Sequence, residues 1–86
     1  MVENLEYYKV FYFAAKYGSL TTAAVELSIS QPAVSQALKQ LENGLGVKLF
    51  VRASKGIKLT PEGGVLYEHV KAGYEQMELG EKKLSS

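Results

Sequence analysis

The sequence predicts a small, mainly α-helical domain that carries one β-hairpin and continues into a long helix. Three observations lead to this fold class. Apolar residues recur at helical spacing in four segments, and capping residues or glycines mark the ends of most of them. Between the third and fourth segments, two short apolar runs flank the turn sequence ASKG. With 86 residues, the chain is divided into a domain over residues 1–60 and a helix over residues 61–86.

The first two predicted helices meet at a sharp corner. Asn4 can cap the first helix, and Gly18 can end it. A shorter helix begins at Ser19 or its neighbours, and residues 28–30 that follow it are enough only for a tight turn. The first helix has a broad apolar face that we expect to be buried, formed by Leu5, Tyr8, Phe11, Tyr12, Phe13 and Ala15.

The third predicted helix has one apolar and one polar face. Ser30 can cap its first free amides, and Pro32 fits the first turn because no acceptor is needed for its missing N–H. The face expected in the core carries Val34, Leu38, Leu41 and Leu45. The opposite face, which we expect to meet a partner, carries Pro32, Gln36, Lys39, Gln40 and Asn43.

After the third helix, the sequence predicts a basic hairpin over about residues 49–59 and a fourth helix from Pro61 to about Leu84. Adjacent Gly63 and Gly64 each cost about 1 kcal/mol relative to alanine, so we expect this helix to begin loosely. Its apolar residues follow alternating steps of three and four, interrupted by Glu81, and so resemble a coiled-coil seam: Tyr67, Val70, Tyr74, Met77 and Leu84. A second copy of the helix can cover this seam, and for Leu66 and Val70 packing onto their own domain is an equal alternative.

Positive charge is concentrated in the middle third of the chain. Residues 31–60 contain five Lys or Arg residues and a single acidic residue, Glu42, although the net charge of the whole chain is only +1. Clustered positive charge attracts phosphates, so we expect a polyanionic partner. The alternative is a basic surface that serves solubility alone.

Composition excludes several other classes of protein. The sequence contains no cysteine, which rules out disulfides and thiolate zinc sites and favours a reducing compartment, with the cytoplasm as the default. With His69 as the single histidine and no glycine-rich phosphate loop, we predict no metal site, no cofactor and no enzymatic activity. Charged residues interrupt the apolar N-terminal segment, so we predict neither a signal peptide nor a membrane helix.

The predicted order of elements describes a winged helix-turn-helix, whose third helix has the size to enter the DNA major groove. The segment GSLTTAAVELSISQPAVSQALKQLENGLGVKLFVR, followed by LTPEGG, resembles the N-terminal DNA-binding domain of LysR-type transcriptional regulators over about Leu5–Leu66. This resemblance implies a bacterial regulator that binds double-stranded DNA as a homodimer through a long linker helix, with tetramers as an option in the full-length protein. It also implies that a larger C-terminal domain binds a small-molecule effector, and hence that the chain is an excised fragment.

The resemblance and side-chain chemistry together identify candidate functional residues. In the family, the third helix (about residues 31–45) reads the major groove and the wing (about 49–59) follows the backbone or minor groove. The candidate DNA-binding residues are Thr21, Thr22, Ser30, Gln31, Pro32, Ala33, Ser35, Gln36, Lys39, Arg52 and Lys55. The candidate dimerisation residues are Leu66, Tyr67, Val70, Tyr74 and Met77.

One candidate departs from the family pattern, because Gln36 stands where many members carry arginine. Glutamine amides can pair with adenine, whereas the missing arginine would contact guanine or phosphate. The alternative for Gln31, Ser35 and Gln36 is ordinary solvated helix surface, and for Arg52 and Lys55 a hairpin charged for solubility. For the whole chain, the alternative function is a winged-helix module that binds another protein and not DNA.

Overall fold

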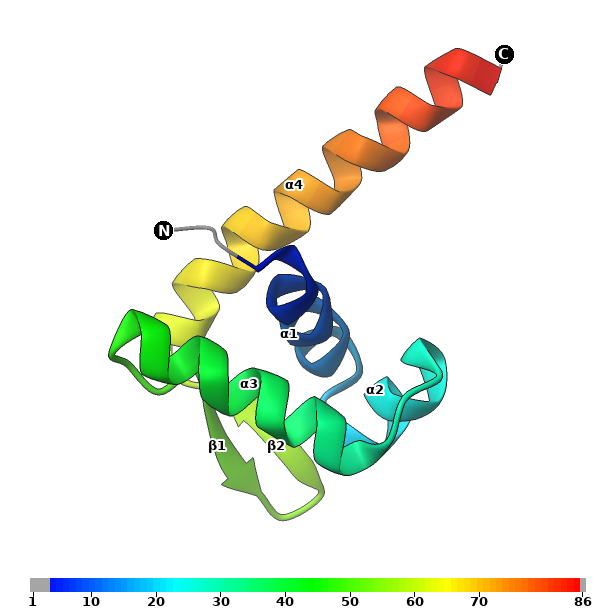
Figure 1. The fold of residues 1–86 in the computed structure, drawn as a ribbon. Coiled ribbons are helices and arrows are strands. Elements are labelled where there is room, and N and C mark those ends of the chain that lie inside the picture. The colour runs from blue at the N-terminus through cyan, green and yellow to red at the C-terminus, as the bar shows by residue number, and fades with distance from the viewer. Residues whose placement is uncertain (1–3, 86) are drawn as a thin grey trace.

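A computed structural model describes residues 4–85 and confirms a mainly helical winged helix-turn-helix with one antiparallel hairpin (Figure 1). The elements of this part of the chain are α1 (Leu5–Tyr17), α2 (Leu20–Leu27), α3 (Gln31–Leu45), β1 (Phe50–Ala53), β2 (Gly56–Leu59) and α4 (Pro61–Ser85). The first three helices pack together, the hairpin lies beside α3, and α4 runs past α1 and projects beyond the body (Figure 1).

Capping residues mark where the first three helices start and end, and the sequence predicts four of them: Asn4, Gly18, Ser19 and Ser30. The side chains of Asn4, Ser19 and Ser30 each accept a backbone N–H from the first turn of the helix that follows them. Gly18 and Gly46 end α1 and α3 in the left-handed conformation, with φ of 63° and 73°, which glycine adopts without a steric penalty. Local signals of this kind act over a few residues, and so they could be read from the sequence.

The core lies where α1, α2 and α3 meet the start of the hairpin. Its buried residues are Val10, Phe11, Ala14, Ala23, Ala24, Val34, Leu38, Leu41 and Leu49. The Phe11 ring is fully buried and lies 5.5 Å from the Phe50 ring and 6.4 Å from the Tyr67 ring, between centroids. The apolar stripe predicted for the third helix is therefore the side of α3 that closes the core.

The first half of α4 packs against its own domain. Leu66, Tyr67 and Val70 are partly buried against the core, as the alternative for Leu66 and Val70 anticipated. Tyr74 stacks on Tyr12 of α1, with ring centroids 4.4 Å apart and planes within 12°. Burial, with smaller contributions from nearby Glu6 and Tyr12, raises the pKa of the Tyr74 hydroxyl above its usual value. The aromatic face of α1 thus covers much of the seam that was expected to face a partner.

The second half of α4 has no such cover within the described residues. Every residue from 75 to 85 is exposed, with Met77 at 59% and Leu84 at 90% of their full surface. The helix contains 25 residues and is therefore about 37 Å long. Neither α4 nor any other helix within residues 4–85 combines the length and apolar character that crossing a membrane requires.

The start of α4 is tightly held, contrary to the loose start expected from its two glycines. Thr60 Oγ1 accepts the backbone N–H of Gly63 at 3.0 Å and donates to the carbonyl oxygen of Lys48 at 2.6 Å. Gly63 is buried directly against the carbonyl group of Leu49, where a side chain would not fit. The sequence could not reveal this role, because the partner backbone lies fourteen positions earlier in the chain.

The two neighbouring glycines provide a matched test of this close approach. Gly63→Ala should lower the free energy of unfolding by about 2 to 3 kcal/mol, since its Cβ collides with the Leu49 carbonyl and packs against Leu59. Gly64→Ala should raise it by about 1 kcal/mol, because nothing lies within 4 Å of the new Cβ and alanine favours the helix. Urea unfolding measures both, and changes of the same sign would contradict the assignment.

Candidate nucleic-acid interface

A tight turn sets the direction of α3 relative to α2. Ser28 ends α2 in the left-handed conformation with φ of 58°, and the N–H of Ile29 donates back to the carbonyl of Ala24 at 3.0 Å. Ser30 then caps α3 by accepting the N–H of Ala33 at 3.2 Å. Three residues therefore separate the two helices, as the sequence predicts, and α3 starts at a defined position on the surface.

The candidate base-reading residues share the solvent side of α3. Val34, Leu38 and Leu41 of α3 face the core, so the opposite side of the helix is free to meet a partner. Ser35 is half-buried at the edge of this side. The remaining candidates of α3 and its cap are exposed: Ser30, Gln31, Pro32, Ala33, Gln36 and Lys39. Thr21 and Thr22 are exposed in the first turn of α2, which packs against α3.

The hairpin places Arg52 and Lys55 at the surface, with Arg52 beside α3. Arg52 lies on β1 opposite Ile57 of β2, and Lys55 lies in the two-residue turn between the strands. Both side chains are exposed. The N–H of Ile57 donates to the carbonyl oxygen of Gly18 at 3.2 Å, and Gly56 packs against the same group. The hairpin is therefore anchored to the corner between α1 and α2.

A groove of about 310 Å³ lies between α3 and the hairpin and brings basic side chains together from three segments. Lys39 comes from α3, Lys48 from the connection before β1, and Arg52 from β1. The full lining is Leu20, Ser35, Leu38, Lys39, Glu42, Lys48, Phe50, Val51, Arg52 and Ile57. Three cations beside a polar helix face suit the phosphates of a nucleic acid.

Sequence reasoning missed Lys48 and Glu42 as members of this groove. Lys48 belongs to the basic middle third, so its charge was visible in the sequence, but its place between α3 and the hairpin was not. Glu42 is the single acidic side chain among the described residues of the lining. Its carboxylate accepts the N–H groups of Leu49 at 2.6 Å and Phe50 at 3.3 Å.

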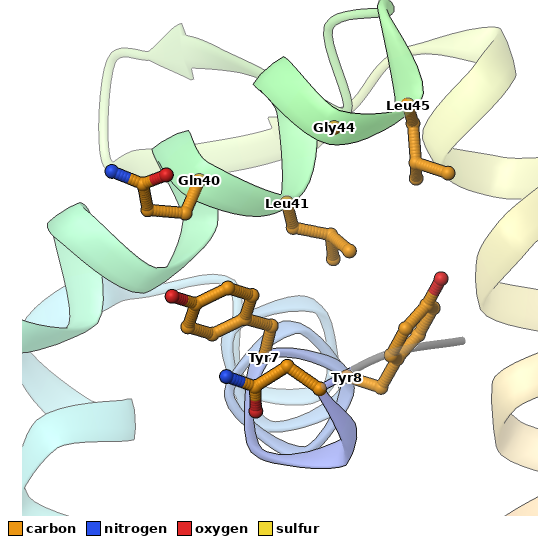
Figure 2. A pocket seen from close by; sticks show the side chains of 7 residues that line it. Tyr7, Tyr8, Gln40, Leu41, Gly44 and Leu45 are labelled. Atoms are coloured by element: carbon orange, nitrogen blue, oxygen red, sulfur yellow. The ribbon is translucent and has the colours of Figure 1, made fainter. Parts of the chain in front are cut away.

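A second hollow, of about 410 Å³, opens between α1 and α3 (Figure 2). Figure 2 shows Tyr7 and Tyr8 on α1 facing Leu41 and Leu45 on α3, with Gly44 leaving space between the helices. Its lining is Asn4, Tyr7, Tyr8, Gln40, Leu41, Gly44 and Leu45, none of which carries a charge. The described residues of this hollow include no cation that could bind a phosphate. The groove between α3 and the hairpin does contain cations and is therefore the candidate interface.

Comparison with known proteins identifies a related family. Residues 5–64 match the family described as bacterial regulatory helix-turn-helix protein, lysR family. The chain is 40% identical over 72 residues to the HTH-type transcriptional regulator PerR of Escherichia coli K12, which covers 84% of this chain and 24% of PerR. The chain thus spans about a quarter of the length of the curated relatives that it matches.

Solved structures with the same fold include protein–DNA complexes. The BenM DNA-binding domain in complex with the catB site 1 DNA superposes with a TM-score of 0.79 at 32% identity, covering 96% of this chain and 97% of that one. DarR of Vibrio fischeri in complex with DNA superposes with a TM-score of 0.80 at 30% identity, covering 99% of this chain and 29% of DarR.

Two serines at the α2–α3 turn should respond to substitution in opposite directions. Ser30→Ala removes the cap of α3 and should destabilise the fold by about 1 kcal/mol. Ser28→Gly should stabilise it by up to about 1 kcal/mol, because glycine adopts the positive φ at this position without strain. Thermal or urea unfolding of both variants measures the difference. Destabilisation by Ser28→Gly would show that the turn depends on the Ser28 side chain instead.

Proposed function

Because this chain belongs to the lysR family of bacterial regulatory helix-turn-helix proteins, we propose that it is the DNA-binding part of a bacterial transcription regulator. It binds double-stranded DNA sequence-specifically, with α3 in the major groove and the hairpin on the backbone or in the minor groove. The main support is the polar face of α3 beside a groove that gathers Lys39, Lys48 and Arg52. A module that binds only proteins is not favoured, since solved relatives include DNA complexes.

Base recognition is assigned to the N-terminal part of α3. The amide of Gln31 or Gln36 can donate to and accept from adenine, and the Ser35 hydroxyl can contact a base or a phosphate. The carbon atoms of Pro32 and Ala33 suit the methyl group of thymine. With Gln36 in place of the arginine common in the family, we expect adenine to be preferred over guanine at the position that it reads.

Contacts to the DNA backbone are assigned to the residues around the base-reading face. Thr21, Thr22 and Ser30 are exposed at the starts of α2 and α3, where side-chain hydroxyls and free backbone amides can bind phosphates. On the other side, Lys39, Lys48, Arg52 and Lys55 supply positive charge. These contacts position the domain on the duplex and add affinity that falls with salt.

We propose that two chains pair through α4. The seam passes from Leu66 and Val70, which face the core, to Met77 and Leu84, which are exposed. On the same side of the helix, nothing lies within 4 Å of a Cβ added at Gly73 or Gly80, so a second helix can approach closely. Two further seam residues, Tyr67 and Tyr74, contact α1, where they pack against Phe11 and Tyr12.

Pairing supports function because one half-site offers few base contacts. Two recognition helices joined in one dimer raise the affinity for a DNA site with two half-sites through their effective concentration. The chain spans about a quarter of its curated relatives, and we propose that the full-length protein adds a C-terminal domain that binds a small-molecule effector. We expect such a regulator to act in the cytoplasm, with tetramers as an option at full length.

The base-reading assignment predicts a loss of sequence discrimination. Gln31→Ala and Ser35→Ala should each reduce the preference for a selected DNA site over a scrambled one, by about 1 to 3 kcal/mol where the side chain forms a bidentate pair with a base. The site is first selected from a random DNA pool with the wild-type chain, and binding is then measured by fluorescence anisotropy. Gln76→Ala, which removes an exposed amide on α4, is the control. Wild-type preference in both variants would contradict the assignment.

The backbone assignment predicts a uniform loss of affinity. Arg52→Ala, Lys55→Ala or Lys48→Ala should weaken binding to selected and scrambled DNA alike, and each should lower the slope of log K against log salt by about one. Titrations at several salt concentrations measure this slope. Lys71→Ala, an exposed cation on α4, should leave the slope unchanged. A wild-type slope in all three variants would remove the hairpin and its groove from the interface.

The dimer assignment predicts that charge on the outer seam gives a folded monomer. Met77→Glu combined with Leu84→Glu places like charges opposite each other in the paired helices, without touching the contact between Tyr74 and Tyr12. Sedimentation equilibrium at tens of micromolar and circular dichroism measure assembly and fold. Leu79→Glu, an exposed apolar residue outside the seam, is the control. A dimer that survives the double substitution, or a monomeric wild-type chain, would refute the assignment.

A further inference from the structure

Glu42 occupies an unfavourable position for a protein that binds phosphates. It lies on α3 in the groove that also contains Lys39, Lys48 and Arg52, and it is the single acidic residue between positions 31 and 60. A carboxylate in this position repels the phosphates that its neighbours attract. If Glu42 acted only as a charge, it would weaken DNA binding.

Those contacts are two hydrogen bonds to the chain segment that leads into the hairpin. Oε2 of Glu42 accepts the backbone N–H of Leu49 at 2.6 Å and that of Phe50 at 3.3 Å. Leu49 belongs to no helix or strand, so its amide has no ladder partner, whereas Phe50 is the first residue of β1. Leu49 is almost fully buried, at 1% of its full surface, and an ionised acceptor makes a particularly strong bond to its amide.

The same segment is also held by Thr60, the residue that precedes α4. The Thr60 hydroxyl donates to the carbonyl of Lys48 at 2.6 Å, and the Thr60 N–H donates to the carbonyl of Leu49 at 3.0 Å. Glu42 therefore binds the N–H groups of residues 49 and 50, and Thr60 binds the carbonyl groups of residues 48 and 49. Arg52 follows Phe50 by two positions on β1, so the position of this cation relative to α3 depends on these bonds.

We propose that Glu42 is a positioning residue for DNA binding, which holds the hairpin and Arg52 at a fixed place beside the recognition helix. This inference rests on the proposed function, since it concerns how the hairpin reaches DNA. The gain from a well-placed Arg52 outweighs the repulsion from one carboxylate whose charge is already directed at two amides. Glu42 itself contacts no DNA.

Substitution by glutamine and by alanine separates positioning from charge. Both Glu42→Gln and Glu42→Ala remove the negative charge, but glutamine keeps an oxygen that can accept the Leu49 and Phe50 amides. A pure charge effect makes the two variants equal and tightens DNA binding in both. A positioning effect makes glutamine intermediate between the wild type and alanine.

The first experiment measures how much Arg52 contributes to DNA affinity when position 42 is Glu, Gln or Ala. Arg52→Ala is combined with wild-type Glu42, with Glu42→Gln and with Glu42→Ala, and each chain is titrated with the selected DNA duplex at one salt concentration. We expect Arg52→Ala to weaken binding about tenfold with Glu42 present, about threefold with Gln and less than about twofold with Ala. Glu68→Ala, an exposed acidic residue on α4, is the matched control and should leave the tenfold effect intact.

The second experiment tests the hydrogen bonds without DNA. Amide hydrogen exchange at Leu49 and Phe50 should accelerate about tenfold or more in Glu42→Ala and less in Glu42→Gln, whereas the buried α1 amides of Phe11 and Ala14 should change little. If Glu42→Ala fails to fold by circular dichroism, the Glu42→Gln chain decides both experiments.

The outcomes distinguish this inference from the proposed function. The positioning role is overturned if Arg52→Ala weakens binding tenfold in the Glu42→Gln chain and in the Glu42→Ala chain. It is also overturned if Glu42→Gln and Glu42→Ala tighten DNA binding equally. In both cases the proposed DNA binding itself stands. Unchanged exchange at Leu49 and Phe50 overturns the positioning role as well. A wild-type chain that shows no salt-sensitive DNA binding overturns the proposed function, and the role of Glu42 in it.

Discussion

Leu49 is the point at which the recognition helix, the hairpin and the long helix are joined. Its side chain is buried in the core, its N–H bonds to Glu42 of α3, and its carbonyl accepts the N–H of Thr60 and leaves room only for Gly63 beside it. A buried backbone segment outside regular structure must find partners for its polar groups, and Glu42 and Thr60 provide them for Leu49. This junction therefore contributes to the placement of α3, the hairpin and α4 relative to one another.

The attraction of this chain for phosphates depends on where its charges lie, and much less on its net charge. A net charge of +1 suggests little affinity for nucleic acid, yet Lys39, Lys48 and Arg52 gather in one groove. Lysine and arginine residues on α3, its connection and β1 meet there because the chain reverses direction after Gly46. A field concentrated on one face attracts phosphates, while the acidic residues of α1 and α4 keep the whole molecule nearly neutral.

The long helix has two different tasks along its length. Its first half completes the core through Leu66, Tyr67 and Val70, and Tyr74 extends this contact by stacking on Tyr12. Its second half projects beyond the body with an uncovered apolar seam (Figure 1). Because the helix is continuous between the halves, a partner that docks on the projecting part would be oriented relative to α3 by the packing of the buried part.

The sequence by itself determined the elements and their ends, because caps such as Ser30, prolines and helix-ending glycines act through bonds to residues one turn away. It also determined the polar face of α3, since helical periodicity separates that face from the buried one. Only the tertiary structure decided what covers the first half of α4, why Gly63 is needed, and that Glu42 holds the hairpin. Each of these depends on a neighbour distant in sequence, and an apolar or charged pattern along the chain does not specify which neighbour that is.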